Sequence, residues 1–194
     1  MILAAGGSAR LGFPKQLVVH EGDPLVRRAA KAALDAGATP VMVVLGADAT
    51  LVAATLSGLP QVRTVVNEHW ATGLASSLAT GLRALMEIAG CDAVLVMLAD
   101  QPLVDAAALK RLLGALDTDH RIVASAYNGT IGVPAVFGCE YVEGLMHLSG
   151  DSGAGQWLRG VHSHEVTTVT IPEAGYDLDT AAEVERLKSE GSGR

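Results

Sequence analysis

The chain has 194 residues, of which 49% are hydrophobic and 4% aromatic, and its formal net charge at pH 7 is −7. This length is typical of one domain, whose core is built mainly from Val, Leu, Ala and Ile. The negative charge and the lack of a basic patch argue against nucleic acid as a partner. The lack of an apolar run of about 18 residues argues against a membrane-spanning segment.

The cysteines and the N-terminus bear on the cellular compartment. Cys91 and Cys139 are the only cysteines, and their spacing matches neither a metal site nor a disulfide framework. We therefore expect two reduced thiols in or beside apolar segments. The N-terminus lacks the basic stretch that precedes the apolar part of a secretory signal. Together these features predict a cytoplasmic protein.

Apolar runs along the chain predict the strands of a sheet. The runs are continuous rather than alternating, which suggests strands that are covered on both faces. The predicted strands occupy residues 1–3, 41–45, 62–66, 92–98, 121–126, 134–137 and 166–171.

Helical patterns lie between these runs. A helix is predicted over residues 24–36, with Asp23 as its N-cap and Gly37 just beyond its end. A last helix is predicted over residues 180–190. The glycine-rich stretch 150–160 is expected to be a mobile loop.

The alternation of strands and helices predicts an α/β fold. We expect a three-layer sandwich with a mostly parallel central sheet and a Rossmann-like architecture. One domain is expected over residues 1–188, followed by a flexible tail over residues 189–194. Ligands of such sheets bind beyond the carboxyl ends of the strands, so the loops at those ends are the candidate sites.

The loop after the first strand contains small residues followed by two cations. Gly6, Gly7 and Ser8 let the backbone pass close to a ligand, and successive N–H groups in such a loop suit phosphate. Arg10 adds a planar guanidinium and Lys15 a compact ammonium group. The spacing fits neither the Walker pattern nor the dinucleotide-binding pattern. We interpret the loop as a triphosphate cradle, and the two cations disfavour an ordinary surface loop.

Carboxylates form a second candidate group. Asp100 follows the strongest predicted strand and is a natural Mg²⁺ ligand, although it could instead cap a helix that starts near Val104. Asp177 and Asp179 have the alternate spacing that points two side chains to one side of an extended chain. One of them could complete the metal site. Either Asp179 or Thr180 could cap the last helix.

Motifs along nearly the whole chain resemble those of the molybdenum cofactor nucleotidyltransferases, and within them the cytidylyltransferase-like branch. The motifs occur in the order of that family. They are Leu-Ala-Ala-Gly to Pro-Lys-x-Leu at 3–17, Asn-x-x-Trp-x-x-Gly-x-x-x-Ser-Leu at 67–78, Asp-Gln-Pro at 100–102, Gly-x-Pro at 132–134, Gly-Asp-x-Gly-Ala at 150–154 and Asp-x-Asp-Thr at 177–180.

This resemblance implies a nucleotidyltransferase fold and a Mg²⁺-dependent enzyme. It implies transfer of CMP from CTP to the phosphate of molybdopterin, with release of pyrophosphate, and transient contact with a molybdoenzyme. In the family, Leu-Ala-Ala-Gly goes with CTP, and a second glycine in place of Ala5 goes with GTP.

The candidate residues fall into overlapping groups. The catalytic candidates are Arg10, Lys15 and Asp100, and the metal candidates are Asp100 and Asp179. The nucleotide-binding candidates also include Leu3, Ala4, Ala5, Gly6, Gly7, Ser8, Asn67 and Ser76. The acceptor-binding candidates are Gln101, Gly150 and Asp151.

Other interpretations remain open from the residues. The acceptor could be a sugar or polyol phosphate, or the chain could be a non-catalytic maturation protein that binds the molybdenum cofactor. Gly155 stands where the family usually has Arg or Lys. Trp70 could stack on a ligand, but the interpretation we favour is that it anchors its loop to the core.

Overall fold

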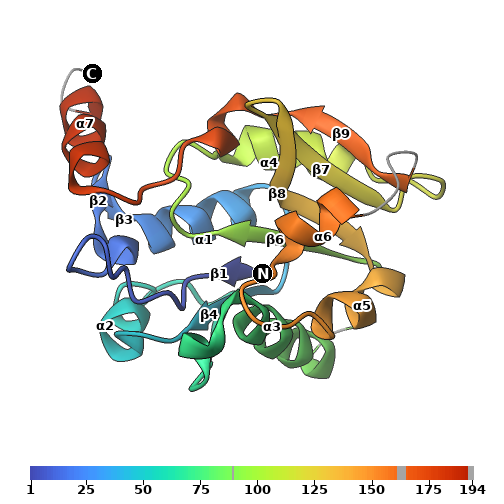
Figure 1. Ribbon diagram of the computed structural model, residues 1–194, viewed down its shortest axis with the longest axis horizontal. Coiled ribbons are helices and arrows are strands. Elements are labelled where there is room, and N and C mark those ends of the chain that lie inside the picture. The colour runs from blue at the N-terminus through green and yellow to red at the C-terminus, as the bar shows by residue number, and fades with distance from the viewer. Residues whose placement is uncertain (89, 161–164, 192–194) are drawn as a thin grey trace.

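The computed structural model describes residues 1–88, 90–160 and 165–191 (Figure 1). The strands are β1 (Ile2–Leu3), β2 (Val19–His20), β3 (Asp23–Pro24), β4 (Val41–Leu45), β5 (Val62–Val66), β6 (Ala93–Leu98), β7 (Ile122–Tyr127), β8 (Thr130–Gly138) and β9 (Thr167–Thr170). The α-helices are α1 (Leu25–Asp35), α2 (Ala49–Ala54), α3 (Leu74–Ile88), α4 (Ala106–Gly114), α5 (Val142–Met146), α6 (Ala154–Gly160) and α7 (Ala181–Gly191).

The central sheet confirms the predicted α/β fold. Within the described residues it has 7 strands in the order β5-β4-β1-β6-β8-β7-β9, and β2 pairs with β3 separately. The pairs β1 with β4, β1 with β6, β4 with β5 and β7 with β9 are parallel. Only β8 runs against its neighbours β6 and β7 among the strands of this sheet that the structure describes. The strands β6, β7 and β9 therefore end at the same edge as β1.

Two apolar layers cover the sheet, one on each face. Side chains of α1 and α4, such as Val26 and Leu109, pack on one face against Val43 and Met97. Side chains of α3, α5 and α6 pack on the other face, where Phe137 is buried. Strand residues alternate between the two layers, and both are apolar, which explains the continuous apolar runs in the sequence. Figure 1 shows the helices on both sides of the sheet.

The start of α1 differs from its prediction. Asp23 does not cap the helix, because Pro24 occupies the N-cap position and no side chain bonds to the first turn there. Asp23 instead forms ion pairs with Arg27, at 3.3 Å, and with Lys31. Its position in the short β2–β3 ladder directs the carboxylate along the helix rather than to the helix end. Gly37 does follow the helix with a positive φ of 94°, as predicted.

The prediction of a mobile loop over residues 150–160 is also wrong, because its second half forms helix α6. Trp157 on this helix contacts the rings of Phe137 and Tyr141 edge-on, at 5.8 and 5.9 Å between centroids. Leu158 is completely buried. This packing outweighs the low helix propensity of the glycines.

The expectation of reduced thiols is wrong in this structure. Cys91 and Cys139 form a disulfide with 6.3 Å between their Cα atoms. The antiparallel pairing of β6 with β8 aligns Ala93 with Gly138, so the residues just outside both strands meet. The sequence spacing carries no sign of this pairing.

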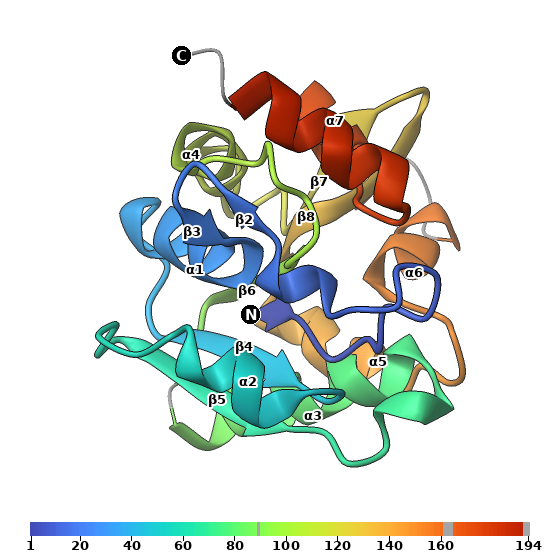
Figure 2. The same cartoon turned by 90° about the vertical axis from the view of Figure 1, so that its left-hand side faces the viewer.

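The last helix packs away from the sheet. Figure 2 shows α7 beside the β2–β3 ladder, where Val184 and Leu187 bury with Val18 and Leu25. The helix continues to Gly191, past the position at which the tail is expected to start. The rest of that expected tail, residues 192–194, lies outside the described residues.

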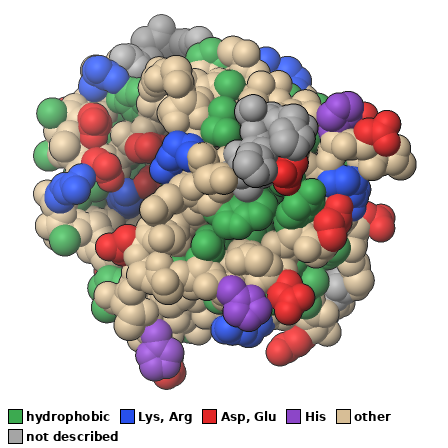
Figure 3. Space-filling view, turned by 45° about the vertical axis from the view of Figure 1, so that its right-hand side comes forward, with side chains coloured by type: hydrophobic (Ala, Val, Ile, Leu, Met, Phe, Trp, Pro, Cys, Tyr) green, Lys and Arg blue, Asp and Glu red, His purple; other side chains and the backbone are tan. Residues whose placement is uncertain are grey.

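Two surface properties complete the description. In the part of the chain that the structure describes, no helix is both long and apolar enough to cross a bilayer. On the face drawn in Figure 3, Lys and Arg side chains stand among Asp and Glu side chains.

Close packing of α3 on the sheet leads to a testable prediction. A Cβ on Gly81 would lie 2.5 Å from Val44 Cγ2 and 2.3 Å from Met1 Sδ. We predict that Gly81→Ala lowers the free energy of unfolding by about 1–3 kcal/mol through overpacking, although alanine ordinarily favours a helix. Gly144→Ala is the matched control, because a Cβ there meets nothing within 4 Å. Urea unfolding measures both variants, and a Gly81→Ala protein as stable as the control contradicts the prediction.

Candidate functional site

The site lies at the carboxyl ends of β1 and β6, where ligands of such sheets bind. A cavity of about 410 Å³ opens there. It is lined by Leu3, Ala4, Ala5, Gly6, Lys15, Gln16, Trp70, Ala71, Gly73, Leu74, Ser77, Leu98, Ala99, Asp100 and Asp151. A second cavity around Arg10 shares Gly6, Lys15, Leu74 and Asp151 with it and adds Ser8 and Asp179. The predicted loop and the predicted carboxylates therefore meet at one place.

The glycine loop leaves amide groups free for an anion. Among the described residues, the N–H groups of Gly6, Gly7 and Ser8 have no hydrogen-bond partner. Ser8 Oγ accepts a hydrogen bond of 3.0 Å from the Lys15 amide, which closes the loop on itself. Gln16 is buried, and its Nε2 donates to Ala4 O at 2.9 Å and to Gly6 O at 2.8 Å. Gln16 thus fixes the loop through its carbonyl groups, while the amides of Gly6, Gly7 and Ser8 stay available. Sequence reasoning missed Gln16, because nothing in its type or spacing sets it apart.

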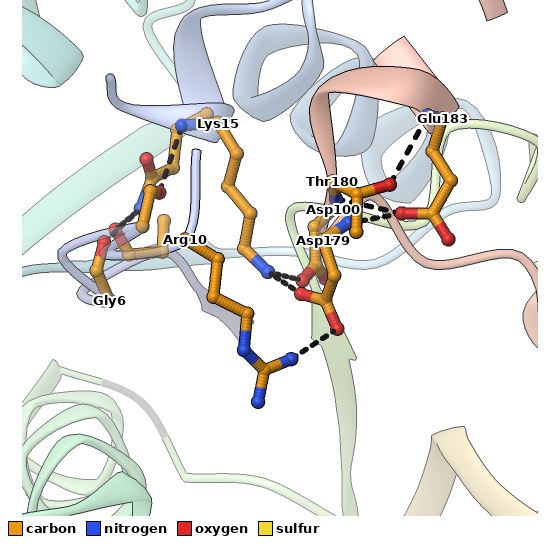
Figure 4. A network of polar contacts seen from close by, with 10 residues as sticks. Gly6, Arg10, Lys15, Asp100, Asp179, Thr180 and Glu183 are labelled. Atoms are coloured by element: carbon orange, nitrogen blue, oxygen red, sulfur yellow. Dashed lines mark hydrogen bonds and ion pairs between the residues drawn. The ribbon is translucent and has the colours of Figure 1, made fainter. Parts of the chain in front are cut away.

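An ion cluster is the centre of the site (Figure 4). Lys15 Nζ contacts a carboxylate oxygen of Asp100 and lies 3.0 Å from Asp179 Oδ1. The side chains of Lys15 and Asp100 are only 19% and 14% exposed, whereas Asp179 is 48% exposed. Arg10 lies at the rim, with its Nη1 3.6 Å from Asp179 Oδ2. The structure brings together all the catalytic and metal candidates of the sequence analysis.

Charges within the cluster shift the protonation equilibria. Burial lowers the pKa of Lys15, but the charge and hydrogen bonds of Asp100 and Asp179 outweigh burial, so the pKa is raised overall. The hydrogen bond from Lys15 holds the pKa of Asp179 below its usual value, against some desolvation. Lys15 is therefore fully charged, and Asp179 is ionised at neutral pH.

The segment before α7 places Asp179. Glu183 Oε2 accepts hydrogen bonds from the amides of Asp179 and Thr180, at 2.9 and 2.8 Å. The Glu183 amide donates to Thr180 Oγ1 at 3.3 Å. This is a capping box with Thr180 as the cap, so the carboxylate of Asp179 is left for Lys15. The Leu178 amide also donates to Asp100 O at 3.1 Å, which ties the segment to the end of β6.

Asp177 is a third carboxylate at this place, and the sequence analysis considered it beside Asp179 as the residue that could complete a metal site. Desolvation of its carboxyl group, with the negative charges of Asp100 and Asp179, raises its pKa to about 6. The residue as a whole is exposed. The alternate spacing with Asp179 is the sequence signal for it, but that spacing leaves open which of the two carboxylates joins the cluster.

Asp100 does not cap a helix. Asp105 takes that role for α4, since its Oδ1 accepts a 2.8 Å hydrogen bond from the Ala108 amide. Asp100 Oδ1 is buried and has no hydrogen-bond partner among the described residues, so one strong acceptor in the site is unsatisfied. Over residues 1–88, 90–160 and 165–191, no three His, Cys, Asp or Glu side chains are grouped to hold a metal ion unaided. A hard cation here would need phosphate oxygens or water as further ligands.

The Asn67 segment is built as a braced loop. Asn67 is buried, and its Nδ2 donates to Ser76 Oγ at 2.8 Å and to Ser77 Oγ at 3.0 Å. Its Oδ1 accepts from the His69 amide at 3.0 Å. Ser77, rather than the candidate Ser76, lines the cavity. Direct contact of Asn67 or Ser76 with a nucleotide stays a prediction.

Trp70 anchors this segment, as we expected. A Cβ on Gly7 would lie 2.9 Å from Trp70 Cη2, and one on Gly46 would lie 2.7 Å from Trp70 Cβ. Gly7 therefore lets the indole ring pack directly against the loop after β1, and Gly46 leaves room for the Cβ of Trp70. Trp70 also lines the cavity, so the same side chain can anchor its loop and contact a ligand.

The acceptor candidates differ in role: Gln101 and Gly150 make contacts within the fold, whereas Asp151 lines the cavities. Gln101 is buried, and its Nε2 donates to Val133 O at 3.1 Å and to Ala174 O at 2.8 Å. Gly150 approaches so closely that a Cβ on Gly73 would lie 2.2 Å from Gly150 O. Asp151 is exposed and lines both cavities. Of these candidates, Asp151 is the one with a side chain at the cavity wall.

Comparison with known proteins identifies the class. Residues 1–167 match the family described as the MobA-like NTP transferase domain. The chain is 33% identical to nicotine blue oxidoreductase of Paenarthrobacter nicotinovorans over 96% of its own length and 94% of that protein. In structure it is similar to Rv0371c of Mycobacterium tuberculosis H37Rv, with a TM-score of 0.78 and 29% identity, covering 97% and 96% of the two chains. It is also similar to a nucleotidyl transferase from Methanothermobacter thermautotroptrophicus (Mth528), with a TM-score of 0.78 and 26% identity, covering 98% and 95%.

The fold and the site thus define a nucleotidyltransferase-type enzyme. The chain belongs to the MobA-like NTP transferase domain family, which confirms the family resemblance of the sequence motifs. A nucleoside triphosphate is the substrate class of this family.

The ion cluster leads to a stability prediction. Lys15→Met leaves two carboxylates close together without their cation, so we predict a loss of about 1–3 kcal/mol in the free energy of unfolding. The double variant Lys15→Met/Asp100→Asn should recover part of that loss, because it removes one of the unpaired charges. Lys31→Met is the matched control, since its pair with Asp23 is more exposed and is worth less than about 1 kcal/mol. Urea unfolding at neutral pH decides, and equal losses for Lys15→Met and Lys31→Met would argue against the cluster.

Proposed function

We propose that this protein transfers the CMP moiety of CTP to the phosphate of molybdopterin and releases pyrophosphate. The observation that carries the proposal is the cluster of Lys15 with Asp100 and Asp179 beside free loop amides. Phosphoryl-type transfer needs alignment and charge neutralisation rather than a protein nucleophile. This site offers both and lies next to a cavity large enough for a nucleotide base.

The residues would act as follows. The amides of Gly6, Gly7 and Ser8 bind the triphosphate, and Arg10 meets its outer oxygens from the rim. Lys15, released from the carboxylates, turns to the oxygens on which charge develops as the acceptor oxygen attacks the α-phosphorus. The apolar wall with Trp70 excludes water from the reacting atoms.

A divalent cation fits the donor set. Asp100 has an unsatisfied buried oxygen, and Asp179 faces the same ammonium group. Asp100 and Asp179 would hold Mg²⁺, which would neutralise negative charge on the phosphate groups of the substrate. The two carboxylates would complete the ligand set with phosphate and water.

A second candidate is an oxidoreductase. It is favoured by one observation, the 33% identity with nicotine blue oxidoreductase over nearly the full length of both proteins. A nucleotidyltransferase with a sugar or polyol phosphate as its acceptor would use the same site. So would a maturation protein that binds the molybdenum cofactor and delivers it to a molybdoenzyme without chemistry.

One set of incubations separates these candidates. The purified protein is given CTP or GTP, Mg²⁺ and molybdopterin, and the product is identified by its mass. The proposal expects a cytidine-containing product and stoichiometric pyrophosphate. In parallel incubations a sugar phosphate or a polyol phosphate replaces molybdopterin. Pyrophosphate release only with one of these would identify a sugar or polyol phosphate as the acceptor instead of molybdopterin. Bleaching of nicotine blue with a nicotinamide hydride donor, without pyrophosphate release, would favour the oxidoreductase.

The two cluster carboxylates give a catalytic prediction. Asp100→Asn and Asp179→Asn should each lower turnover by about 10²-fold or more, because each removes a charge that positions the triphosphate and its cation. Asp35→Asn, at an exposed position on α1, is the matched control and should keep parental turnover. Circular dichroism establishes that the variants are folded. Near-parental turnover in both cluster variants would remove these residues from the mechanism.

The base preference gives a further prediction. Ala5 is buried in the cavity wall, where its methyl group narrows the space for a base. We predict that CTP is preferred over GTP and that Ala5→Gly shifts the ratio of kcat/KM values towards GTP. The shift corresponds to about 1–3 kcal/mol, the worth of one methyl-sized change in a pocket. Competition between the two triphosphates measures this ratio. A parental preference for GTP would refute the assignment of CTP as the substrate but would leave the proposed nucleotidyl transfer standing.

A further inference from the structure

The ammonium group of Lys15 holds the two carboxylates that the proposed function assigns to a divalent cation. Its Nζ contacts Oδ2 of Asp100 and lies 3.0 Å from Oδ1 of Asp179. Figure 4 shows the ammonium group at both carboxylates and the Arg10 guanidinium at the other oxygen of Asp179. The ammonium group and a divalent cation would therefore compete for the same pair of carboxylates.

The four oxygens of these two carboxylates can be followed one by one. Lys15 Nζ contacts Asp100 Oδ2 and Asp179 Oδ1, and Arg10 Nη1 lies 3.6 Å from Asp179 Oδ2. The fourth oxygen, Asp100 Oδ1, is buried, so an ion that arrives from solvent meets one of the other three first. Each of those three already faces a cationic side chain. A divalent ion must displace these side chains before it can bind both carboxylates.

The two cationic side chains are held to different degrees. The Lys15 side chain is 19% exposed and pairs with two carboxylates, of which Asp100 is itself largely buried. Taking such an ammonium group away from its anions is costly unless another anion receives it. The Arg10 side chain is 80% exposed and its contact with Asp179 is longer, and a pair of this kind contributes little. Lys15, rather than Arg10, therefore controls access to the carboxylates.

A triphosphate in the loop after β1 would be an anion that can receive Lys15. One cavity is lined by Gly6, Ser8, Lys15 and Asp179 together, so loop amides, the ammonium group and a carboxylate of the pair border the same space. The Lys15 amide donates to Ser8 Oγ at 3.0 Å, which ties the Lys15 backbone to this loop. The flexible four-carbon side chain can therefore turn from the carboxylates to phosphate oxygens while its backbone stays in place.

We propose that Lys15 keeps this carboxylate pair closed to divalent cations until a triphosphate binds. The proposal rests on the nucleotidyl transfer proposed above and adds the order in which the ligands bind. The triphosphate draws the ammonium group away, which frees Asp100 and Asp179 to hold a cation together with phosphate oxygens. Because linkage between two ligands is reciprocal, the cation and the triphosphate strengthen each other's binding by the same factor.

Binding of Mn²⁺ without any nucleotide tests this role. Electron paramagnetic resonance separates free from bound Mn²⁺ in solutions of the full chain. Lys15→Met should bind Mn²⁺ about tenfold more tightly than the parent, because the ion no longer displaces an ammonium group and relieves the repulsion between two carboxylates. Lys31→Met, whose partner Asp23 lies outside the site, is the matched control and should bind like the parent. Equal affinities of Lys15→Met and the parent would overturn the proposal.

A second variant locates the gained binding. Lys15→Met/Asp100→Asn should lose the gain, because one of the two carboxylates is gone. Mn²⁺ should also raise the Tm of Lys15→Met more than that of the parent, since an ion held by the folded state stabilises that state. A gain in affinity that survives Asp100→Asn would place the ion elsewhere and would overturn the proposal.

A measurement on the parent protein keeps this inference separate from the proposed function. The Cε–Hε resonance of Lys15, assigned by its loss in Lys15→Arg, is followed by NMR. Inorganic triphosphate without metal should shift it in a saturable manner, and Mg²⁺ alone should leave it unchanged. No shift with triphosphate, or a saturable shift with Mg²⁺ alone, would overturn the proposal. If the parent makes no product from CTP and molybdopterin, the proposed function fails, and the Mn²⁺ and NMR measurements still decide on Lys15.

Discussion

The structure depends on one electrostatic constraint, which is that two carboxylates at the same sheet edge require a cation between them. Lys15 meets this requirement by contacting Asp100 and Asp179 from a largely buried position. Three distant segments are joined in this way: the loop after β1, the end of β6 and the segment before α7. Each segment is also held by hydrogen bonds of its own, through Gln16 Nε2, the Leu178 amide and the Glu183 carboxylate, so the backbone positions the charged groups before their side chains meet.

The surroundings of this cluster differ in chemistry from an open groove at β7, β9 and α6. Around the cluster, the free amides of the loop after β1 and the cations Arg10 and Lys15 face an apolar wall that holds Trp70 in place. Among the described residues, that groove is lined by hydroxyl and amide groups, apolar side chains and one arginine. Close glycine contacts, such as Gly73 against Gly150, hold the walls at fixed distances.

The sequence predicts what local chemistry determines and misses what tertiary contacts decide. The main strands, the three layers and the meeting of the charged loop with Asp100 follow from apolar runs and from polar residues at strand ends, whereas the direct contact of Lys15 with Asp100 is seen only in the structure. The cap at Asp23 was wrong because ion pairs along the helix compete for the carboxylate. The disulfide was missed because only the β6–β8 register brings Cys91 to Cys139. The choice between Asp179 and Thr180 as helix cap depended on Glu183, whose capping role requires the folded turn.

The separation of Lys15 from Asp179 by 164 positions has a consequence for synthesis. A ribosome delivers Lys15 long before Asp179, so the strands of the sheet between them can assemble before the ion cluster is complete. The nascent chain at that stage contains the cradle but lacks Asp179 and the turn that orients it. The ion cluster therefore becomes complete only when this turn docks onto the loop after β1, and until then Lys15 lacks one of its two carboxylate partners.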